Sequence, residues 1–470
     1  MRKLAPVAFV FLAGCSQMPP YQRPATPVAA QWPEVLPPAA GQASAGLSWR
    51  QLLPAPRLQT LIEAALEHNR DLRVAVARVE EARAQYGIAR ADRLPGIDLA
   101  ASGSTIRTPA DLSPTGQRVT ARRYDVNLGL TAFELDFWGR VASLAEAAKA
   151  SYLATDEAQR AFRLSLVTDV ATTYFTLLEL EERMALGRTN VTSRAETRRL
   201  IDKRRQVGIA GDLDFLAADG AYQSALADLA SLERQGAAAA NALTLLVGKP
   251  LTAPLAEGTL ADQGIVVDLA PGLPSEVLVR RPDVLAAEQR LVAANANIGA
   301  ARAAFLPRIS LTAAFGTASK ALSGLFDAGS GAWNFQPVLR LPLFDFGRTA
   351  ANVDLAEARK VIAVAEYERA IQQAFREVAD LLVAREKLAV QLAAQQAGEK
   401  SQAERLKIVD ARYQAGISSY LEVLDAQREL FAAQQGTVQT RRALLTTAAQ
   451  LYKALGGGME LGTGISAKAT

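Results

Sequence analysis

The side chains that most often carry chemistry are almost absent from this sequence. It contains one cysteine, Cys15, and one histidine, His68. Cys15 directly follows the targeting segment at the start of the chain, and once it is modified there no thiol remains to pair with His68. No second imidazole is present for a metal site. His68 stands in the polar stretch Glu67-His68-Asn69, where we expect it to be solvated. No phosphate-binding glycine loop is present, and Gly248-Lys249-Pro250 is a helix terminator. We therefore expect no enzyme, no metal and no cofactor.

The cysteine lies in a processing site. Met1-Arg2-Lys3 is a positive start, residues 4–12 are mostly apolar, and Leu12-Ala13-Gly14-Cys15 follows. This arrangement resembles the bacterial lipobox, which implies that residues 1–14 are a signal peptide and that Cys15 is lipidated. Several acyl chains anchor a protein firmly, because each buried CH₂ contributes roughly 0.8 kcal/mol. Ser16, in place of an aspartate, implies the outer membrane. The alternative is an ordinary signal peptide with an incidental cysteine.

The overall composition suits long helices. Half of the residues are apolar but only 6% are aromatic, so the apolar content is mainly Ala, Leu and Val. A formal charge of +4 without a basic block gives no sign of nucleic-acid binding. Residues 15–47 are rich in Pro, Ala and Gln and predict an extended tether, which the lipobox resemblance implies is lipidated at Cys15. After residue 14 no apolar run reaches about 18 residues, so we expect strands to make any membrane crossing.

The chain repeats itself. Three landmarks recur at an offset of 208 residues: Gly139-Arg140 with Gly347-Arg348, Gln206-Val207-Gly208-Ile209 with Gln414-Ala415-Gly416-Ile417, and 246–248 with 454–456. A fourth recurs at an offset of 212, where residues 90–95 match residues 302–307. Such a constant shift indicates a tandem duplication. We assign the first repeat to residues 48–258, the second to 259–459, and a C-terminal tail to 460–470.

Each repeat predicts a helix, two strands and a long helical hairpin. In the first repeat the helix covers residues 56–94, and residues 124–131 alternate apolar with small or polar side chains as a strand does. After Ala132 the apolar phase slips by one residue, as a β-bulge would produce. Residues 139–207 and 212–247 then form the hairpin, about 100 Å long at 1.5 Å per residue. The second repeat alternates at 309–316 and 333–343, and its hairpin turns at Gly416 as the first turns at Gly208, with Asp212 and Ser419 as expected N-caps.

The strands predict an oligomeric channel. Four strands cannot cross lipid alone, because their edge N–H and C=O groups would lie unpaired in hydrocarbon. Three chains give a twelve-stranded barrel with a lumen, whereas two give an eight-stranded barrel filled by side chains. Aromatic residues at strand ends predict an interfacial girdle made of Trp138, Trp333, Phe344 and Phe346. A soluble β-sandwich is the alternative.

Several motifs carry a family resemblance. Trp49-Arg50, residues 61–66, Arg280-Arg281-Pro282-Asp283-Val284 and residues 424–428 resemble the outer-membrane efflux lipoproteins of the TolC-like outer membrane factor family. The resemblance covers nearly the whole mature chain. It implies a mainly α, tandem-duplicated TolC-like fold with a membrane β-barrel portion and a long periplasmic helical tunnel. It further implies a homotrimer that joins a periplasmic adaptor and an inner-membrane pump.

The same resemblance places a gate near the hairpin turns. Carried over by motif, Leu421 would be an apolar constriction, Asp425 an acidic ring, and Tyr413 and Arg428 the partners that hold neighbouring helices shut. Glu422 and Asp214 are further candidates because they occupy matching positions in the two repeats. The alternative is that Asp425 and Arg428 form an ordinary i, i+3 surface pair.

The expected function is passive conduction of drugs or other small molecules out of the cell. An exit duct for secreted proteins and a lipid-anchored periplasmic coiled-coil scaffold without a pore are the alternatives. The sequence does not predict the cargo, the pump family or the resting state of the gate.

Overall fold

The structure is a computed structural model, and it describes residues 16–29, 31–32, 42–43, 47–251, 255–266, 269–270 and 278–457. Cys15, the predicted signal peptide and the predicted tail at 460–470 lie outside the described residues. The chain divides into two compact units, described separately below. The strand unit comprises residues 1–25, 78–156 and 286–368, and the hairpin unit comprises residues 26–77, 157–285 and 369–470.

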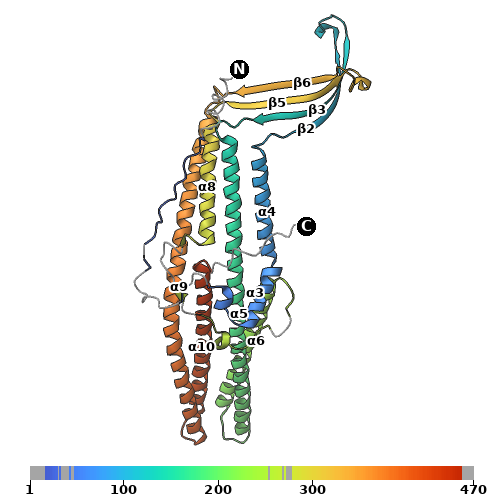
Figure 1. The fold of residues 1–470 in the computed structure, drawn as a ribbon. Coiled ribbons are helices and arrows are strands. Elements are labelled where there is room, and N and C mark those ends of the chain that lie inside the picture. The colour runs from blue at the N-terminus through green and yellow to red at the C-terminus, as the bar shows by residue number, and fades with distance from the viewer. Residues whose placement is uncertain are drawn as a thin grey trace. The chain divides into compact units, whose positions relative to one another are not determined.

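The elements follow one another in the order expected of two similar repeats (Figure 1). The first set is β1 (Gln42–Ala43), α2 (Trp49–Leu52), α3 (Pro56–His68), α4 (Arg70–Ala91), β2 (Asp98–Thr108), η1 (Ala110–Leu112), β3 (Val119–Glu134), α5 (Arg140–Gln206) and α6 (Asp212–Val247). The second set is η2 (Leu260–Gln263), β4 (Leu269–Ala270), α8 (Pro282–Ala303), β5 (Arg308–Ser319), η3 (Leu322–Gly324), β6 (Gly331–Arg340), α9 (Arg348–Gln414) and α10 (Tyr420–Ala454).

The strand unit contains one antiparallel sheet with the order β2-β3-β5-β6. Figure 1 shows these four strands side by side. The two repeats meet in the middle of the sheet, where Leu128 of β3 lies opposite Phe315 of β5. The outer edges of β2 and β6 pair with no other described strand. Pro337 lies in β6, an edge strand, where a residue without an N–H is tolerated.

The predicted β-bulge is confirmed. The pairing of β3 with β5 shifts register between Leu130 and Phe133, and Ala132 adopts a left-handed backbone conformation with φ +50°. Its amide donates to the hydroxyl of Thr312 on β5 at 3.1 Å. The slip in apolar phase therefore marks an extra residue, which turns the following side chains to the other face.

Small side chains hold the helices of the strand unit together. Among the buried residues of α5, α8 and α9 in this unit are Ala145, Ala150, Ala154, Ala287, Ala293, Ala296 and Ala363. Alanine permits close approach of helix axes and favours helix formation, which agrees with the aromatic-poor composition.

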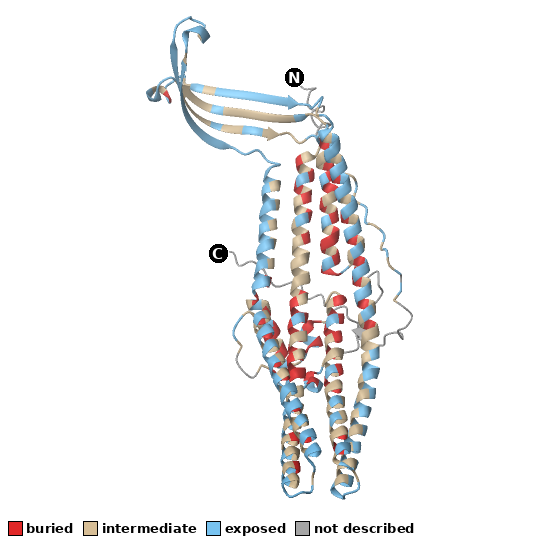
Figure 2. Cartoon of the chain, turned by 180° about the vertical axis from the view of Figure 1, so that it is seen from behind, coloured by how far each residue is buried: buried red, intermediate tan, exposed pale blue. Residues whose placement is uncertain are grey.

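The hairpin unit holds a large apolar core. Its fully buried members include Leu58, Ile62, Tyr174, Phe175 and Leu243, which come from α3, α5 and α6. Figure 2 shows many of the buried residues of this unit where α3 lies against the long helices. The hairpins themselves confirm the prediction, since α5 and α9 each span 67 residues and return as α6 and α10.

The predicted single helix over 56–94 is wrong at one point, because Asn69 separates α3 from α4. The buried Asn69 side chain accepts from the amide of Leu72 at 2.8 Å, as an N-cap does, and donates to the carbonyl of Leu246 at 2.9 Å. The side chain of His68, the last residue of α3, is 28% exposed.

None of the helices in the described ranges combines the length and apolarity needed to span a membrane.

Candidate functional site

The two hairpins turn with the same backbone geometry. Gly208 and Gly416 have φ +76° and +75°, a left-handed conformation that glycine adopts without steric cost. The amide of Gly208 donates to Arg205 O at 3.0 Å, and the amide of Ile209 donates to Arg204 O at 2.8 Å. Gly416 and Ile417 repeat the pattern at 3.0 and 2.9 Å. Both turns are Schellman motifs, which satisfy the last carbonyl groups of α5 and α9.

The acidic residues after the turns cap helices. Glu422 accepts from the amide of Ser419 at 3.2 Å, which makes Ser419 the N-cap of α10 as predicted. Asp214 accepts from the amide of Gly211 at 3.3 Å. Gly211, not the predicted Asp212, is therefore the N-cap of α6, and without a side chain it forms only half of a capping box. Within one chain, Glu422 and Asp214 each accept a hydrogen bond from the backbone amide three residues earlier.

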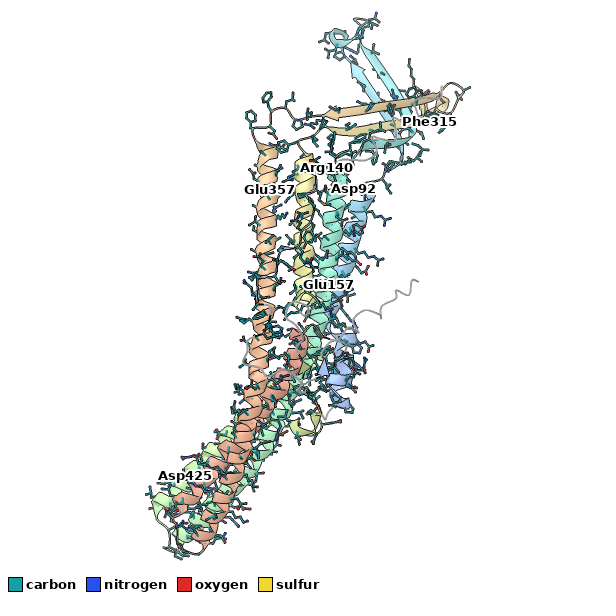
Figure 3. All side chains as sticks on the ribbon, turned by 60° about the vertical axis from the view of Figure 1, so that its left-hand side comes forward. Asp92, Arg140, Glu157, Phe315, Glu357 and Asp425 are labelled. Carbon is teal, nitrogen blue, oxygen red and sulfur yellow. The ribbon has the colours of Figure 1, made fainter. Side chains whose placement is uncertain are left out.

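Asp425 lies at the centre of a cluster of charged residues on the second hairpin (Figure 3). Its carboxylate accepts from Arg428 Nη2 on the same helix at 2.6 Å and from Arg405 Nη2 on α9 at 2.9 Å. Arg428 also contacts Glu429 at 3.2 Å. The surface pair Asp425–Arg428 therefore exists, but Arg405 adds a link between the two helices of this hairpin. The Asp425 side chain is partly exposed and contacts both arginines.

The first hairpin has an equivalent link. Arg198 of α5 binds Asp219 of α6 at 2.5 Å, and its guanidinium also lies over the rings of Phe215 and Tyr222. Arg198 and Asp219 precede Arg405 and Asp425 by 207 and 206 residues, close to the offset of the repeat. Each hairpin thus has an arginine–aspartate pair between its two helices, and the first hairpin has a further one closer to its turn, Arg205 with Asp212 at 3.4 Å.

Tyr413 joins one hairpin to the other. Its hydroxyl accepts from Arg204 Nη1 of α5 at 2.5 Å, and the Arg204 guanidinium lies 5.5 Å from the centre of the Tyr413 ring. The Tyr413 ring also contacts Tyr420 of α10, with 5.7 Å between ring centres. Tyr413 thus links the two hairpins within one chain, whereas Arg428 bonds Asp425 and Glu429 on its own helix, α10. The gate role of both residues stays a prediction.

Leu421 projects away from the chain. Leu421 is 70% exposed, and its counterpart in the first repeat, Leu213, is 80% exposed. Apolar side chains this exposed at matching places are available to meet other molecules or other copies. In contrast to these exposed leucines, the charged residue Arg194 of α5 is only 7% exposed, and burial lowers the pKa of its guanidinium.

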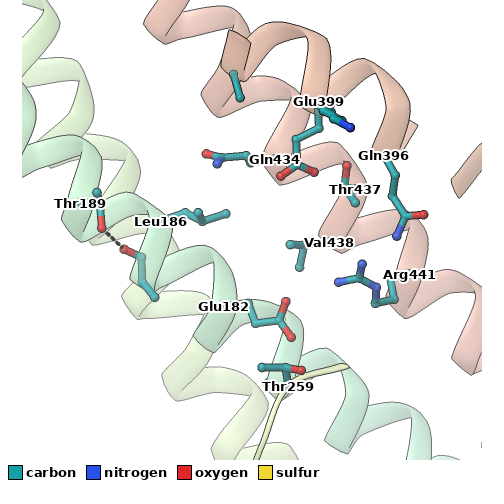
Figure 4. Close-up of a pocket in the computed structure, with 13 residues that line it drawn as sticks. Glu182, Leu186, Thr189, Thr259, Gln396, Glu399, Gln434, Thr437, Val438 and Arg441 are labelled. Carbon is teal, nitrogen blue, oxygen red and sulfur yellow. Dashed lines mark hydrogen bonds between the residues drawn. The ribbon is translucent and has the colours of Figure 1, made fainter. Parts of the chain in front are cut away.

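A second link between the hairpins lies further from the turns. The buried carboxylate of Glu179 on α5 binds Arg183 Nη1 at 2.9 Å and also pairs with Arg442 of α10. Between this link and the Arg204–Tyr413 link lies a cavity of about 680 Å³ (Figure 4). Leu186 and Val438 face it from α5 and α10. The hairpins are thus joined at two levels with open space between them.

The four predicted girdle residues take different positions at the ends of strands. Trp138 follows β3 and donates from Nε1 to the carbonyl of Pro307 at 2.9 Å. Trp333 lies opposite Phe315 in the β5–β6 ladder, and both are more than two-thirds exposed. Phe344 and Phe346 follow β6 and are almost fully exposed. Their membrane contact stays a prediction.

Sequence reasoning missed Arg204 and Arg405. Arg204 belongs to the basic run Lys203-Arg204-Arg205 at the C-terminal end of α5, where cations are favoured by the helix dipole. That run was a usable signal, but nothing local indicated Tyr413 as its partner. Among the described residues, no group of three or more His, Cys, Asp or Glu side chains could hold a metal ion.

Comparison with known proteins decides the family. The family model described as outer membrane efflux protein matches residues 61–249 and again residues 273–457. The chain belongs to the outer membrane efflux protein family. The two matches fall within the two predicted repeats, so each repeat by itself carries the family pattern.

Named relatives extend over almost the whole chain. The outer membrane protein OprJ of Pseudomonas aeruginosa is 46% identical over 458 residues, covering 96% of this chain and 94% of the relative. The solvent efflux pump outer membrane protein SrpC of Pseudomonas putida is 43% identical, covering 97% and 98%. The open-state structure of the MtrE outer membrane channel of Neisseria gonorrhoeae has a TM-score of 0.86 at 39% identity, covering 94% and 98%.

These findings confirm the predicted fold, location and class of function. The chain has the TolC-like fold, with four antiparallel strands in each copy. It resides in the outer membrane and is the channel component of an efflux system. The family and the relatives are transport proteins, and the names of the relatives describe outer membrane proteins of efflux pumps.

Proposed function

We propose that the chain forms a homotrimeric exit duct, which receives drugs or other small molecules from an inner-membrane pump and a periplasmic adaptor. It conducts them passively and catalyses no reaction. The observation that carries this proposal is the four-stranded sheet whose β2 and β6 edges pair with no other described strand. In lipid each unpaired edge group costs several kcal/mol, so β6 of one copy must pair with β2 of the next.

Three copies suit the size of the duct. Twelve strands close a barrel wide enough for an aqueous lumen, while eight leave an interior filled by side chains. The names of the relatives, which include solvent, toluene and antibiotic efflux pump proteins, support small apolar or amphipathic cargo. No observation favours a protein as cargo.

The gate is proposed at the turns of the hairpins. Threefold symmetry turns one Leu421 into an apolar ring and one Asp425 into an acidic ring. Arg405 and Arg428 hold Asp425, and the Arg204–Tyr413 bond holds the second hairpin against the first. Breaking that bond would free the tips of the hairpins, while the buried Glu179–Arg442 pair keeps them joined beyond the cavity.

Lipidation of Cys15 is proposed as the additional anchor. The lipobox-like segment supports it, and Cys15 itself lies outside the described residues. Growth of cells on labelled palmitate tests it, because label must enter the parent protein and must be lost in Cys15→Ser.

Single-channel conductance in planar bilayers tests the duct and its gate. We expect the parent trimer to conduct poorly and Asp425→Ala combined with Arg428→Ala to conduct several-fold better. The pair Arg198→Ala and Asp219→Ala is the matched control, because it removes the equivalent clamp from the first hairpin. Unchanged conductance in the first variant would contradict the gate. A purified protein that stays monomeric and passes no ions would contradict the duct.

A further inference from the structure

The amino-terminal segment is seated on the strand unit. We call residues 16–23 the strap (Figure 1). Ser16 lies against Gly139, where a Cβ on the glycine would come within 3.3 Å of Ser16 Cα. Further along, Pro19 O accepts from Asn295 Nδ2 at 2.8 Å, and Arg23 reaches Glu288. The strap thus runs along α8 in the direction opposite to the helix, and its positions are set by particular side chains.

Glu288 of α8 is the strongest contact point. Arg23 donates to it twice, from Nε to Oε1 at 2.7 Å and from Nη2 to Oε2 at 2.8 Å. Tyr21 Oη donates to Oε1 at 3.1 Å. The side chain of Glu288 is only 7% exposed, whereas that of Arg23 is 51% exposed. A buried carboxylate needs a counter-ion, and here the strap supplies it.

The surface beneath the strap is shaped for it. A Cβ on Gly299 would lie 2.7 Å from Met18 Cα, so only glycine lets the strap approach α8 there. Asn295 is 2% exposed, and its side-chain amide donates to the strap backbone. Burial and the neighbouring Glu288 carboxylate raise the pKa of Tyr21, so its hydroxyl stays a donor. Charge, shape and hydrogen bonding on α8 all match the strap.

We propose that Glu288, Asn295 and Gly299 form a seat for the strap, and that the seat holds the lipidated end of the chain at Gly139, where β3 gives way to α5. This inference rests on the proposed lipidation of Cys15, the residue before Ser16. The anchor then acts at a defined level of the channel instead of at the end of a free tether. Glu288 is a positioning residue, which acts on the lipid through Arg23 and Tyr21.

Chymotrypsin can report whether the strap is seated. It cleaves after aromatic residues unless proline follows, so Tyr21–Gln22 is a cleavable bond while Trp32–Pro33 is not. Cleavage releases a peptide of residues 15–21, which mass spectrometry detects with any acyl chains attached. We expect the purified full-length parent to release it slowly, and Glu288→Ala and Arg23→Met to release it at least tenfold faster. Glu357→Ala is the matched control, because it removes an exposed carboxylate that pairs with Arg302 on α8.

A double variant separates strap seating from a general loss of helix stability. Arg23→Met alone leaves a buried carboxylate without its counter-ion, and Arg23→Met with Glu288→Met removes both charges. We expect the double variant to release the peptide no faster than Arg23→Met alone, since coupled partners are not additive. Additive acceleration would contradict the seat.

The remaining outcomes are distinct. If Arg23→Met and Glu288→Ala resist cleavage as the parent does, or if Glu357→Ala accelerates it equally, the seat is wrong. Release of a peptide without acyl chains would contradict the proposed lipidation and the anchoring role, while the cleavage rates would still decide whether the seat holds the strap.

Discussion

The guanidinium of Arg204, in the first hairpin, donates to the hydroxyl of Tyr413, in the second hairpin, over 2.5 Å. These residues are 209 positions apart, and the bond lies one turn of helix before Gly208 and Gly416. It is one of the contacts that would have to break for the hairpin tips to separate.

Tyr413→Phe should therefore favour the open channel. The substitution removes the hydroxyl acceptor but keeps the ring near Arg204, and a hydrogen bond of this kind contributes about 1 kcal/mol. We expect the open probability in bilayer recordings to rise roughly fivefold, the factor that corresponds to about 1 kcal/mol. Tyr222→Phe, which also removes a hydroxyl near an arginine, should leave it unchanged. A closed channel indistinguishable from the parent would show that the bond does not hold the gate.

Arg405→Gln should open the channel more than Arg428→Gln. Arg405 reaches Asp425 from α9, whereas Arg428 reaches it from the same helix, so only Arg405 ties two helices together. Exposed ion pairs contribute about 0.2–1 kcal/mol and weaken with salt, so the difference should shrink between 0.1 and 1 M salt, roughly the range over which screening shortens from about 10 to 3 Å. Conductance recorded across that range tests the order. Equal effects of the two variants would argue against the inter-helix link.

Gly316→Ala should prevent correct pairing of β3 with β5. A Cβ at residue 316 would lie 2.1 Å from Val126 O and 2.5 Å from Asn127 Cα, and neither backbone atom can move aside without disrupting the ladder. We expect a marked loss of heat-resistant trimers in detergent, since overpacking costs about 1–3 kcal/mol or more. Gly331→Ala, where a Cβ meets nothing within 4 Å, is the control. Normal trimer yield from Gly316→Ala would contradict the observed register.

Asp283 should make stability fall in acid. Burial by itself would raise the pKa of Asp283, but its two bonds with the buried Arg281, at 3.0 and 2.7 Å, outweigh burial and hold the pKa below its usual value. A carboxyl group whose pKa is lowered by folding stabilises the folded state above its unfolded pKa of about 3.9, and that contribution is lost as pH falls below this value. We expect the unfolding temperature of the parent to drop below about pH 4.

Asp283→Asn should reduce that acid dependence and lower the unfolding temperature near pH 7. Arg281 would then rely on Glu377 and on the carbonyl of Ala454, which it already binds at 2.8 and 3.0 Å. Asp71→Asn, in the exposed first turn of α4, is the control. Thermal unfolding from pH 3 to pH 7 measures both. If the unfolding temperature of Asp283→Asn falls with decreasing pH as steeply as that of the parent, other carboxylates cause the acid dependence of stability.

The spacing of apolar side chains along the sequence predicted much of the architecture. Apolar spacing and the absence of proline predicted α5 and α9 almost to the residue, and the phase slip after Ala132 predicted the bulge. These features depend on residues that are close in the sequence, so the local sequence is sufficient to predict them. Strand β2 was not located, because its Ala, Ser and Gly residues alternate too weakly in polarity to be distinguished from a loop.

The sequence by itself determined the duplication, the long hairpins and the turn glycines, because periodicity and backbone sterics act within a few residues. Only the tertiary structure decided which polar side chains meet: Arg405 with Asp425, Arg204 with Tyr413, and Arg23 with Glu288. The last two pairs join residues more than 200 positions apart, and an arginine has the same local pattern whichever carboxylate or hydroxyl it reaches. Its partner is chosen by how the helices pack, which is a property of the whole fold.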